Sequence, residues 1–153
     1  MISVWATLCA APSVCCLHPV FTPGGTRATD FAPPWLLGHV EWAERQVPLF
    51  DFGALIDGTD AAPLTERSRA IILKSLNEGG RVPWLGLVLA GLPRPVTVMP
   101  TDVVEVGDDR KSLGVFRRVV IDESEAIVPD VDRLTHLVTH ATFGALPITQ
   151  LDD

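Results

Sequence analysis

Short apolar runs separated by turn residues make up most of the hydrophobic pattern of this chain. Evenly spaced runs with Gly and Pro between them are typical of an all-β barrel or sandwich and not of alternating strand–helix units. The pattern predicts a mainly β fold. The expected strands are 36–42, 46–52, 70–76, 81–92, 94–100, 115–121 and 126–129, with a hairpin-like pair over 2–10 and 13–21.

One segment has the periodicity of a helix, and we expect that helix over residues 132–142. Its apolar positions recur at i, i+3, i+4 and i+7, which places them in one stripe: Leu134, Leu137, Val138 and Ala141. Asp130 or Asp132 is expected to cap its start, and Gly144 to end it.

Composition narrows the class of protein. A length of 153 residues and a hydrophobic fraction of 47% suit one globular domain over 1–153, with a hairpin and loop over 1–30 and a flexible tail over 146–153. The net charge of −7 argues against nucleic-acid binding, because phosphate backbones repel an acidic surface.

No segment has the pattern of a membrane anchor. The other apolar run, 82–93, falls well short of the ~20 residues that span a bilayer. The apolar N-terminal stretch has no Lys or Arg before Arg27, and Pro12 interrupts it, so it does not fit a signal peptide. We therefore expect a cytoplasmic protein without membrane insertion.

The sequence offers little catalytic chemistry. Cys9, Cys15 and Cys16 are read as reduced, structural thiols, because neighbouring strand residues point to opposite faces and no second ligand pair has zinc-finger spacing. His136 and His140 lack the glutamate of a zinc-protease motif and are read as an exposed polar face. We expect no metal, no cofactor and no catalytic residue.

Three motifs in register point to a known family. Gly38, Pro48 and the Asp51-Phe52 pair have the spacing of the central signature of the CheW-like domain. Residues 86–92 (GLVLAGL) resemble that family's G-L-x-V-D-x-V strand, and 130–134 (DVDRL) resemble its closing helix start. The segments PPWLLGHVEW and VPLFDF are similar to the ChpC-type branch linked to type IV pilus systems.

The resemblance implies both a fold and a role. The expected fold is two five-stranded β-barrels packed through a shared core, with one short C-terminal helix. The expected role is a non-catalytic adaptor that binds a CheA-type histidine kinase and the cytoplasmic tip of a chemoreceptor, in a chemotaxis or type IV pilus pathway. Such a role needs no active site.

The same resemblance implies a partner-binding site at the turn over 43–46. Large rigid side chains commonly anchor interfaces, so the tryptophans near this turn join the candidate site, although burial in the core is an equally open reading for both. The predicted site residues are Trp35, Trp42, Ala43, Glu44, Arg45 and Gln46.

The chain departs from the family pattern at three positions. Ala43 and Glu44 stand where the family has the arginine and glycine of its LRG turn, and Ala90 replaces an aspartate. Two alternatives to coupling therefore stay open: a CheW-like interaction module with a different partner, and a small β-barrel that binds a ligand.

Overall fold

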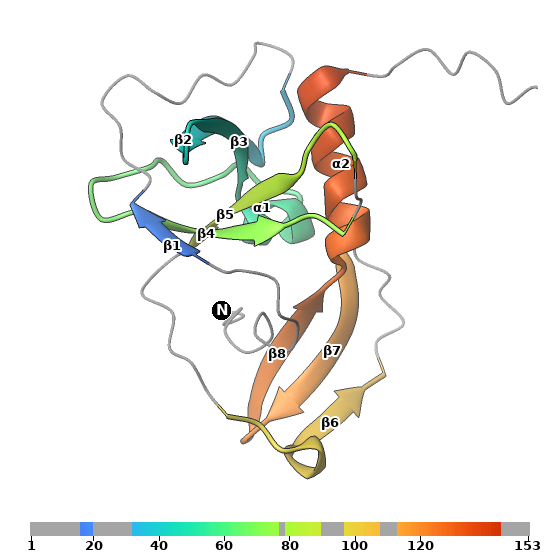
Figure 1. The fold of residues 1–153 in the computed structure, drawn as a ribbon. Coiled ribbons are helices and arrows are strands. Elements are labelled where there is room, and N and C mark those ends of the chain that lie inside the picture. Colours follow the sequence, from blue (N-terminus) through green and yellow to red (C-terminus); the bar gives the residue numbers. More distant parts are fainter. Residues whose placement is uncertain (1–15, 20–31, 77–78, 90–96, 108–112, 145–153) are drawn as a thin grey trace, which may run out of the picture.

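The computed structural model describes residues 16–19, 32–76, 79–89, 97–107 and 113–144. A first sheet, a small sheet and a long C-terminal helix are its main parts (Figure 1). The first sheet consists of β1 (Cys16–Pro19), β2 (Leu36–Trp42), β3 (Arg45–Phe50), β4 (Arg69–Lys74) and β5 (Trp84–Leu89). The small sheet consists of β6 (Val103–Val106), β7 (Val115–Ile121) and β8 (Ser124–Pro129). The helices are α1 (Phe52–Asp57), the 3₁₀ helix η1 (Pro100–Asp102) and α2 (Val131–Phe143).

The two sheets differ in topology. The first sheet has the order β1-β4-β5-β3-β2, and only its β3–β5 pair is parallel. The small sheet is an antiparallel meander in the order β6-β7-β8. In Figure 1, α2 runs along the first sheet, while the small sheet extends away from it at the start of α2.

A shared core joins the three parts. Side chains from the first sheet, α1, α2 and β8 form one buried cluster, in which Phe50, Leu134 and Val138 are wholly buried. Ile127 of β8 belongs to this cluster, and Val115 of β7 packs against it. The small sheet is therefore anchored to the rest of the protein at the end that leads into α2.

A second buried cluster fills the opposite face of the first sheet. Successive side chains alternate between the faces of a strand, so Leu49 belongs to this cluster while Phe50 belongs to the shared core. Trp42 and Trp84 are partly buried against it. Both faces of the first sheet are thus covered by apolar side chains.

The predicted C-terminal helix is confirmed, one residue longer at each end. The Asp130 carboxylate accepts a hydrogen bond from the Arg133 amide at 2.9 Å, which makes Asp130 the cap, and Gly144 follows the last turn. Leu134 and Val138 of the apolar stripe are buried, while Leu137 and Ala141 pack at the edge of the shared core.

The sequence missed the short helix α1. The predicted strand 46–52 ends at Phe50, because the Asp51 side chain accepts the Ala54 amide at 3.0 Å and begins a helix that ends at left-handed Gly58. Phe52 is therefore a buried residue of α1 and not of a strand.

The predicted strand 94–100 is wrong where it can be checked. Residues 97–99 form no strand, Pro100 opens η1, and the strand follows at Val103–Val106. Pro100 lacks the amide hydrogen that a strand ladder needs and fits the first position of a helical turn. Of the predicted N-terminal hairpin, only 16–19 lie within the described residues, and they pair with β4.

The expected fold of two five-stranded barrels is confirmed only in its coarser features. The fold is mainly β with two sheets and one main C-terminal helix, and the described strands number five in one sheet and three in the other.

Candidate functional site

The β2–β3 hairpin carries most of the predicted site. Its turn contains only two residues, Ala43 and Glu44, since Trp42 pairs with Arg45 across the strands. Both have positive φ, 48° and 60°, as a type I′ turn requires. The predicted four-residue turn is thus too long, because Arg45 and Gln46 already belong to β3.

The turn is an exposed, charged tip. Ala43, Glu44, Arg45 and Gln46 are all exposed, as is Glu41, which lies opposite Gln46. Left-handed backbone is costly for residues with a Cβ atom, and Asn-Gly or Asp-Gly is the usual choice at such a turn. The chain instead has the exposed acidic side chain of Glu44 in this turn.

Trp42 is the last residue of β2 and lies directly before this turn. Its ring lies 4.9 Å from that of Trp84 between centroids, with a tilt of 59° between the planes. Trp84 begins β5, so the pair joins the end of the hairpin to the adjacent part of the sheet. Trp42 is partly buried, and it therefore combines a structural contact with an accessible surface next to the turn.

Trp35 lies at the other end of the hairpin. It precedes Leu36, which pairs with Phe50, and its ring makes an edge-to-face contact with Phe50 at 6.4 Å and 85°. The seven residues from Leu36 to Trp42 are joined by six steps of ~3.3 Å, which span about 20 Å. The structure therefore brings Trp42 to the turn but leaves Trp35 beside the shared core.

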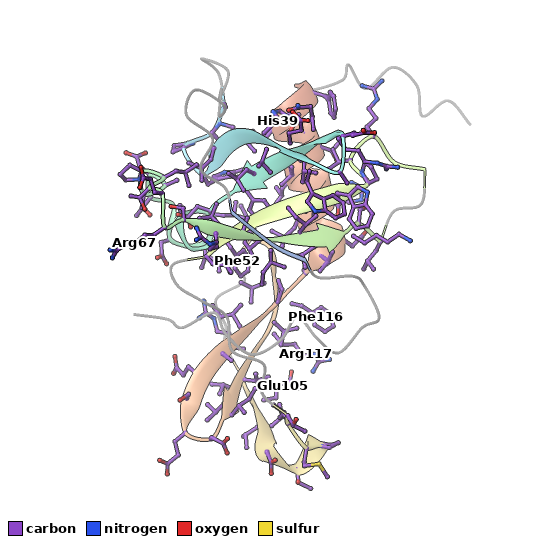
Figure 2. The ribbon with its side chains drawn as sticks, turned by 60° about the vertical axis from the view of Figure 1, so that its left-hand side comes forward. His39, Phe52, Arg67, Glu105, Phe116 and Arg117 are labelled. Atoms are coloured by element: carbon purple, nitrogen blue, oxygen red, sulfur yellow. The ribbon has the colours of Figure 1, made fainter. Side chains whose placement is uncertain are left out.

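His39 is a titratable side chain of this hairpin whose proton affinity is changed by burial. It stands on β2 opposite the buried Pro48 and is itself partly buried (Figure 2). Burial disfavours the charged imidazolium and lowers the pKa of His39 from its ordinary value of 6.5.

The small sheet and the residues next to it expose apolar side chains that the sequence analysis missed. Together we call them the small-sheet patch: Met99, Val103, Val104, Val106, Leu113 and Phe116, all exposed. Met99 and Leu113 lie outside the strands, and Val103 and Val104 point to opposite faces of β6. Val104 is 61% exposed and Phe116 is 60% exposed. The missed signal was the run of apolar residues in 103–106 and 115–121 without strict alternation, which is typical of a sheet covered on both faces.

Charged side chains border this patch. Arg117 forms an ion pair with Glu105 across β6 and β7, and its guanidinium lies 5.1 Å from the centre of the Phe116 ring. Figure 2 shows the three side chains on the small sheet, away from His39. Exposed pairs of this kind contribute little stability, so the apolar exposure is the more informative feature.

The histidines and cysteines considered in the sequence analysis are placed only in part. His136 and His140 are exposed on α2, as expected. Cys9, Cys15 and Ala90 lie outside the described residues, and Cys16 is placed only as part of β1. In the ranges that the structure describes, no three His, Cys, Asp or Glu side chains group as metal ligands. No helix in those ranges is both long and apolar enough to cross a membrane.

Comparison with known proteins identifies the family. The model of the CheW-like domain matches residues 20–138, which is more than half of the chain. The chain belongs to the CheW-like domain family. CheW-like proteins are non-catalytic scaffolds of chemotaxis, so the adaptor class and the absence of enzymatic activity predicted from the sequence are confirmed.

A solved structure shares this CheW-like fold. The scaffolding protein TtCheW from Thermoanaerobacter tengcongensis is 15% identical, with a TM-score of 0.55 over 74% of this chain and 75% of that chain. At that identity the likeness establishes the fold. A search of curated proteins found no match.

Proposed function

We propose that this CheW-like chain couples a chemoreceptor to a CheA-type histidine kinase in the cytoplasm, in a chemotaxis or type IV pilus pathway. Family membership supports the adaptor class. The observation that carries the contact is the exposed tip of the β2–β3 hairpin, with Trp42 and Arg45 beside it. This tip occupies the position of the family's LRG turn, and we assign the kinase or receptor contact to it.

The tip differs from the family turn in charge as well as shape. Ala43 removes a planar guanidinium donor, and Glu44 adds a carboxylate where glycine would be unstrained. A kinase or receptor selected for this chain would present a cation or an amide donor to Glu44. A partner selected for the family arginine would bind this chain weakly.

Arg45→Glu is the direct test of this contact. The side chain is exposed, so the charge reversal leaves the core intact, and we expect binding to the kinase or the receptor to weaken by about tenfold, or 1.4 kcal/mol. Arg67→Glu is the matched control, because Arg67 is also exposed and precedes the end of β4 that is remote from Trp84. Equal affinities for the two variants would exclude the turn as the contact.

Restoring the family residues separates loss of binding from change of partner. Ala43→Arg with Glu44→Gly should tighten binding to a CheA-type kinase if these two positions weakened it. Glu44→Gly alone is the required control, because glycine also relieves the left-handed backbone at this position. No gain beyond that control would favour a CheW-like module with a different partner.

We also propose that the small sheet closes into a barrel with residues 2–15 of the same chain. Its described strands expose the small-sheet patch, and no Asp, Glu, Lys or Arg occurs in residues 1–26. Residues 2–15 carry no charged side chain and include the apolar run 2–10, which makes them a suitable cover for an apolar sheet with open edges.

The cysteines report on this closure. We expect the Cys9 thiol to react with a maleimide at least about tenfold more slowly in the native chain than in urea. Phe116→Asp should raise the native rate, and Leu76→Asp, at an equally exposed residue after β4, should not. A fast native reaction at Cys9 would contradict the closure without affecting the proposed contact at the hairpin.

A further inference from the structure

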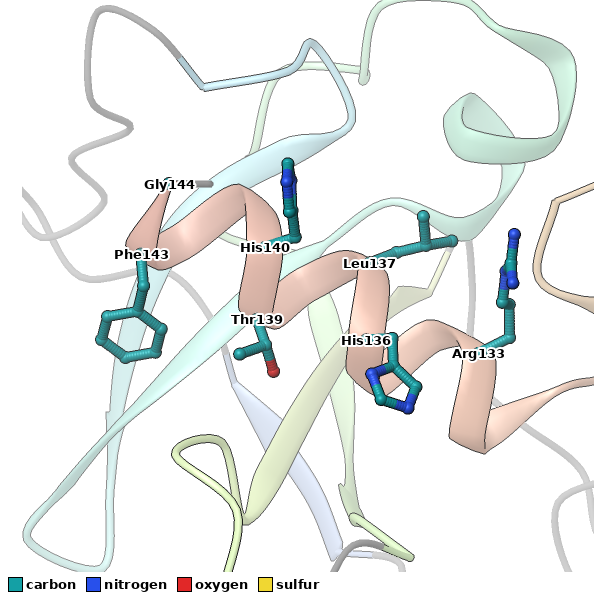
Figure 3. A pocket seen from close by; sticks show the side chains of 7 residues that line it. All are labelled: Arg133, His136, Leu137, Thr139, His140, Phe143 and Gly144. Atoms are coloured by element: carbon teal, nitrogen blue, oxygen red, sulfur yellow. The ribbon is translucent and has the colours of Figure 1, made fainter. Parts of the chain in front are cut away.

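A groove follows the exposed surface of α2 (Figure 3). Its volume is about 380 Å³. Arg133 lies toward one end, Phe143 and Gly144 lie at the other, and His136, Leu137 and His140 lie between them. Among the described residues α2 alone lines the groove, so the helix supplies one wall and a second segment can supply the other.

The groove combines apolar surface with positive charge. Leu137 is partly buried and Phe143 is 48% exposed, so both present apolar area to an occupant. Arg133 contributes a permanent charge, and none of the described lining residues is acidic. Arg81 adds a second cation at the far end, where its guanidinium lies 5.6 Å from the centre of the Phe143 ring.

The chain itself supplies a segment of matching chemistry. Residues 145–153 (ALPITQLDD) follow Gly144 directly. They contain three large apolar residues, Leu146, Ile148 and Leu151, and their only charges are those of Asp152 and Asp153. An anionic, apolar segment is complementary to a cationic, apolar groove.

Backbone geometry allows this segment to turn back. Gly144 has φ 74° and ψ 172°, a conformation that only glycine adopts readily, and it ends the helix. Pro147 opposes any continuation of the helix. The chain must therefore leave the axis of α2 at the end of the groove.

The segment is also long enough. Arg133 and Gly144 are eleven residues apart on a helix, which corresponds to about 16 Å at 1.5 Å per residue. Eight extended residues lead from Gly144 to Asp152 and reach up to about 27 Å. The two aspartates can reach Arg133 with chain to spare, so Leu146 and Ile148 can follow the groove without strain.

We propose that residues 145–153 fold back along α2 and occupy this groove, with Asp152 or Asp153 paired to Arg133 and the apolar residues against Leu137 and Phe143. The occupied groove gives α2 a self-contained surface, separate from the β2–β3 hairpin.

Backbone ¹⁵N relaxation of the full chain tests the proposal. We expect the heteronuclear NOE of residues 146–151 to approach that of α2 in the wild type. It should fall to the values of a flexible chain in Arg133→Glu and in the double variant Asp152→Arg/Asp153→Arg. Arg67→Glu, an equally exposed charge reversal on another element, should leave the NOE unchanged.

A charge swap makes the test specific. Combining Arg133→Glu with Asp152→Arg/Asp153→Arg restores the pair with opposite signs, and the NOE of 146–151 should recover. Phe143→Ser should lower it through the apolar contact alone. Flexible values for 146–151 in the wild type, or a charge swap that fails to restore order lost in Arg133→Glu, would overturn the proposal. Neither result would bear on the hairpin contact.

Discussion

The two sheets of this protein have similar apolar sequences and different surroundings. The first sheet is covered on both faces, by the shared core on one side and by the Trp42–Trp84 cluster on the other. The small sheet reaches the shared core mainly through Ile127 and Val115, while every residue of β6 is exposed. Apolar content therefore indicates that a strand needs a cover, but it does not identify what supplies that cover.

The junction between the two sheets is short and well defined. β8 leads into α2 through Asp130, whose amide donates to the Gly114 carbonyl at 2.8 Å. Leu134, one turn into the helix, packs in the shared core. Substitutions at this junction, within the small-sheet patch and at the two hairpin turns test the difference between a fully covered and a partly covered sheet.

Gly114→Ala should have the largest effect, because it acts at the junction. Gly114 is buried with φ 78°, and an added Cβ would lie 2.7 Å from Leu134 Cδ2. Left-handed strain and overpacking together predict a loss of about 3 kcal/mol in the free energy of unfolding, measured by urea denaturation. Gly107→Ala, at an exposed glycine with no atom within 4 Å of the added Cβ, is the control. Equal losses would mean that the junction does not limit stability.

Phe116→Ala tests directly whether the small sheet is covered. If residues 2–15 close the sheet as proposed, truncation should cost about 2 kcal/mol of unfolding free energy, below the range of about 3–5 kcal/mol for a fully buried phenylalanine. An uncovered surface substitution would cost at most about 0.5 kcal/mol. Leu76→Ala, at a residue that is 61% exposed, gives that reference value in the same protein. A loss no larger than the reference would leave the small-sheet patch as free surface.

The two hairpin turns allow a matched comparison between the sheets. Glu44 of the first sheet and Glu123 of the small sheet are both second residues of two-residue turns, with φ of 60° and 63°. Glycine at either position should relieve left-handed strain and raise the free energy of unfolding by about 1 kcal/mol. Denaturation with both intrinsic fluorescence and circular dichroism would measure the two gains.

The relative size of the two gains is informative. Equal gains would show that both sheets unfold as one cooperative unit. A gain only for Glu44→Gly would show that the small sheet opens before the global transition. A loss of stability in either variant would contradict the assignment of strain to these turns.

The sequence predicted most elements but not the way they are covered. Periodicity placed α2 and limited its cap to Asp130 or Asp132, since a single apolar stripe and an acidic cap are local signals, and the structure selects Asp130. It missed α1, because Asp51 completes a strand motif and caps a helix at the same position. It also missed β6, whose exposed valines have no alternation to mark a strand.

The candidate site was predictable only in part for the same reason. The turn at Ala43 and Glu44 lies close to where the motif spacing placed it. The predicted strand 36–42 already implied that Trp35 and Trp42 lie about 20 Å apart. The spacing did not give the partner of each ring, Phe50 for Trp35 and Trp84 for Trp42, because these contacts form between different strands. The apolar residues of the small-sheet patch were visible in the sequence, but their exposure was not. The groove on α2 arises from the arrangement of the helix in three dimensions, so a linear pattern could not reveal it.

The smallest expected effect is a pH dependence that belongs to the first sheet. Burial lowers the pKa of His39 below 6.5, so the unfolded chain binds the proton more readily than the native chain. Stability from this group is fully present above about pH 6.5, and it is lost as the pH falls through that value toward the lowered pKa. His39→Gln should flatten the rise of unfolding free energy between about pH 5 and 7. Urea midpoints across this range measure the difference. An identical pH profile for wild type and His39→Gln would mean that water solvates the His39 imidazolium within the folded β2–β3 hairpin. The first sheet would then be less well covered than its buried clusters indicate, and the difference from the exposed small sheet would be smaller.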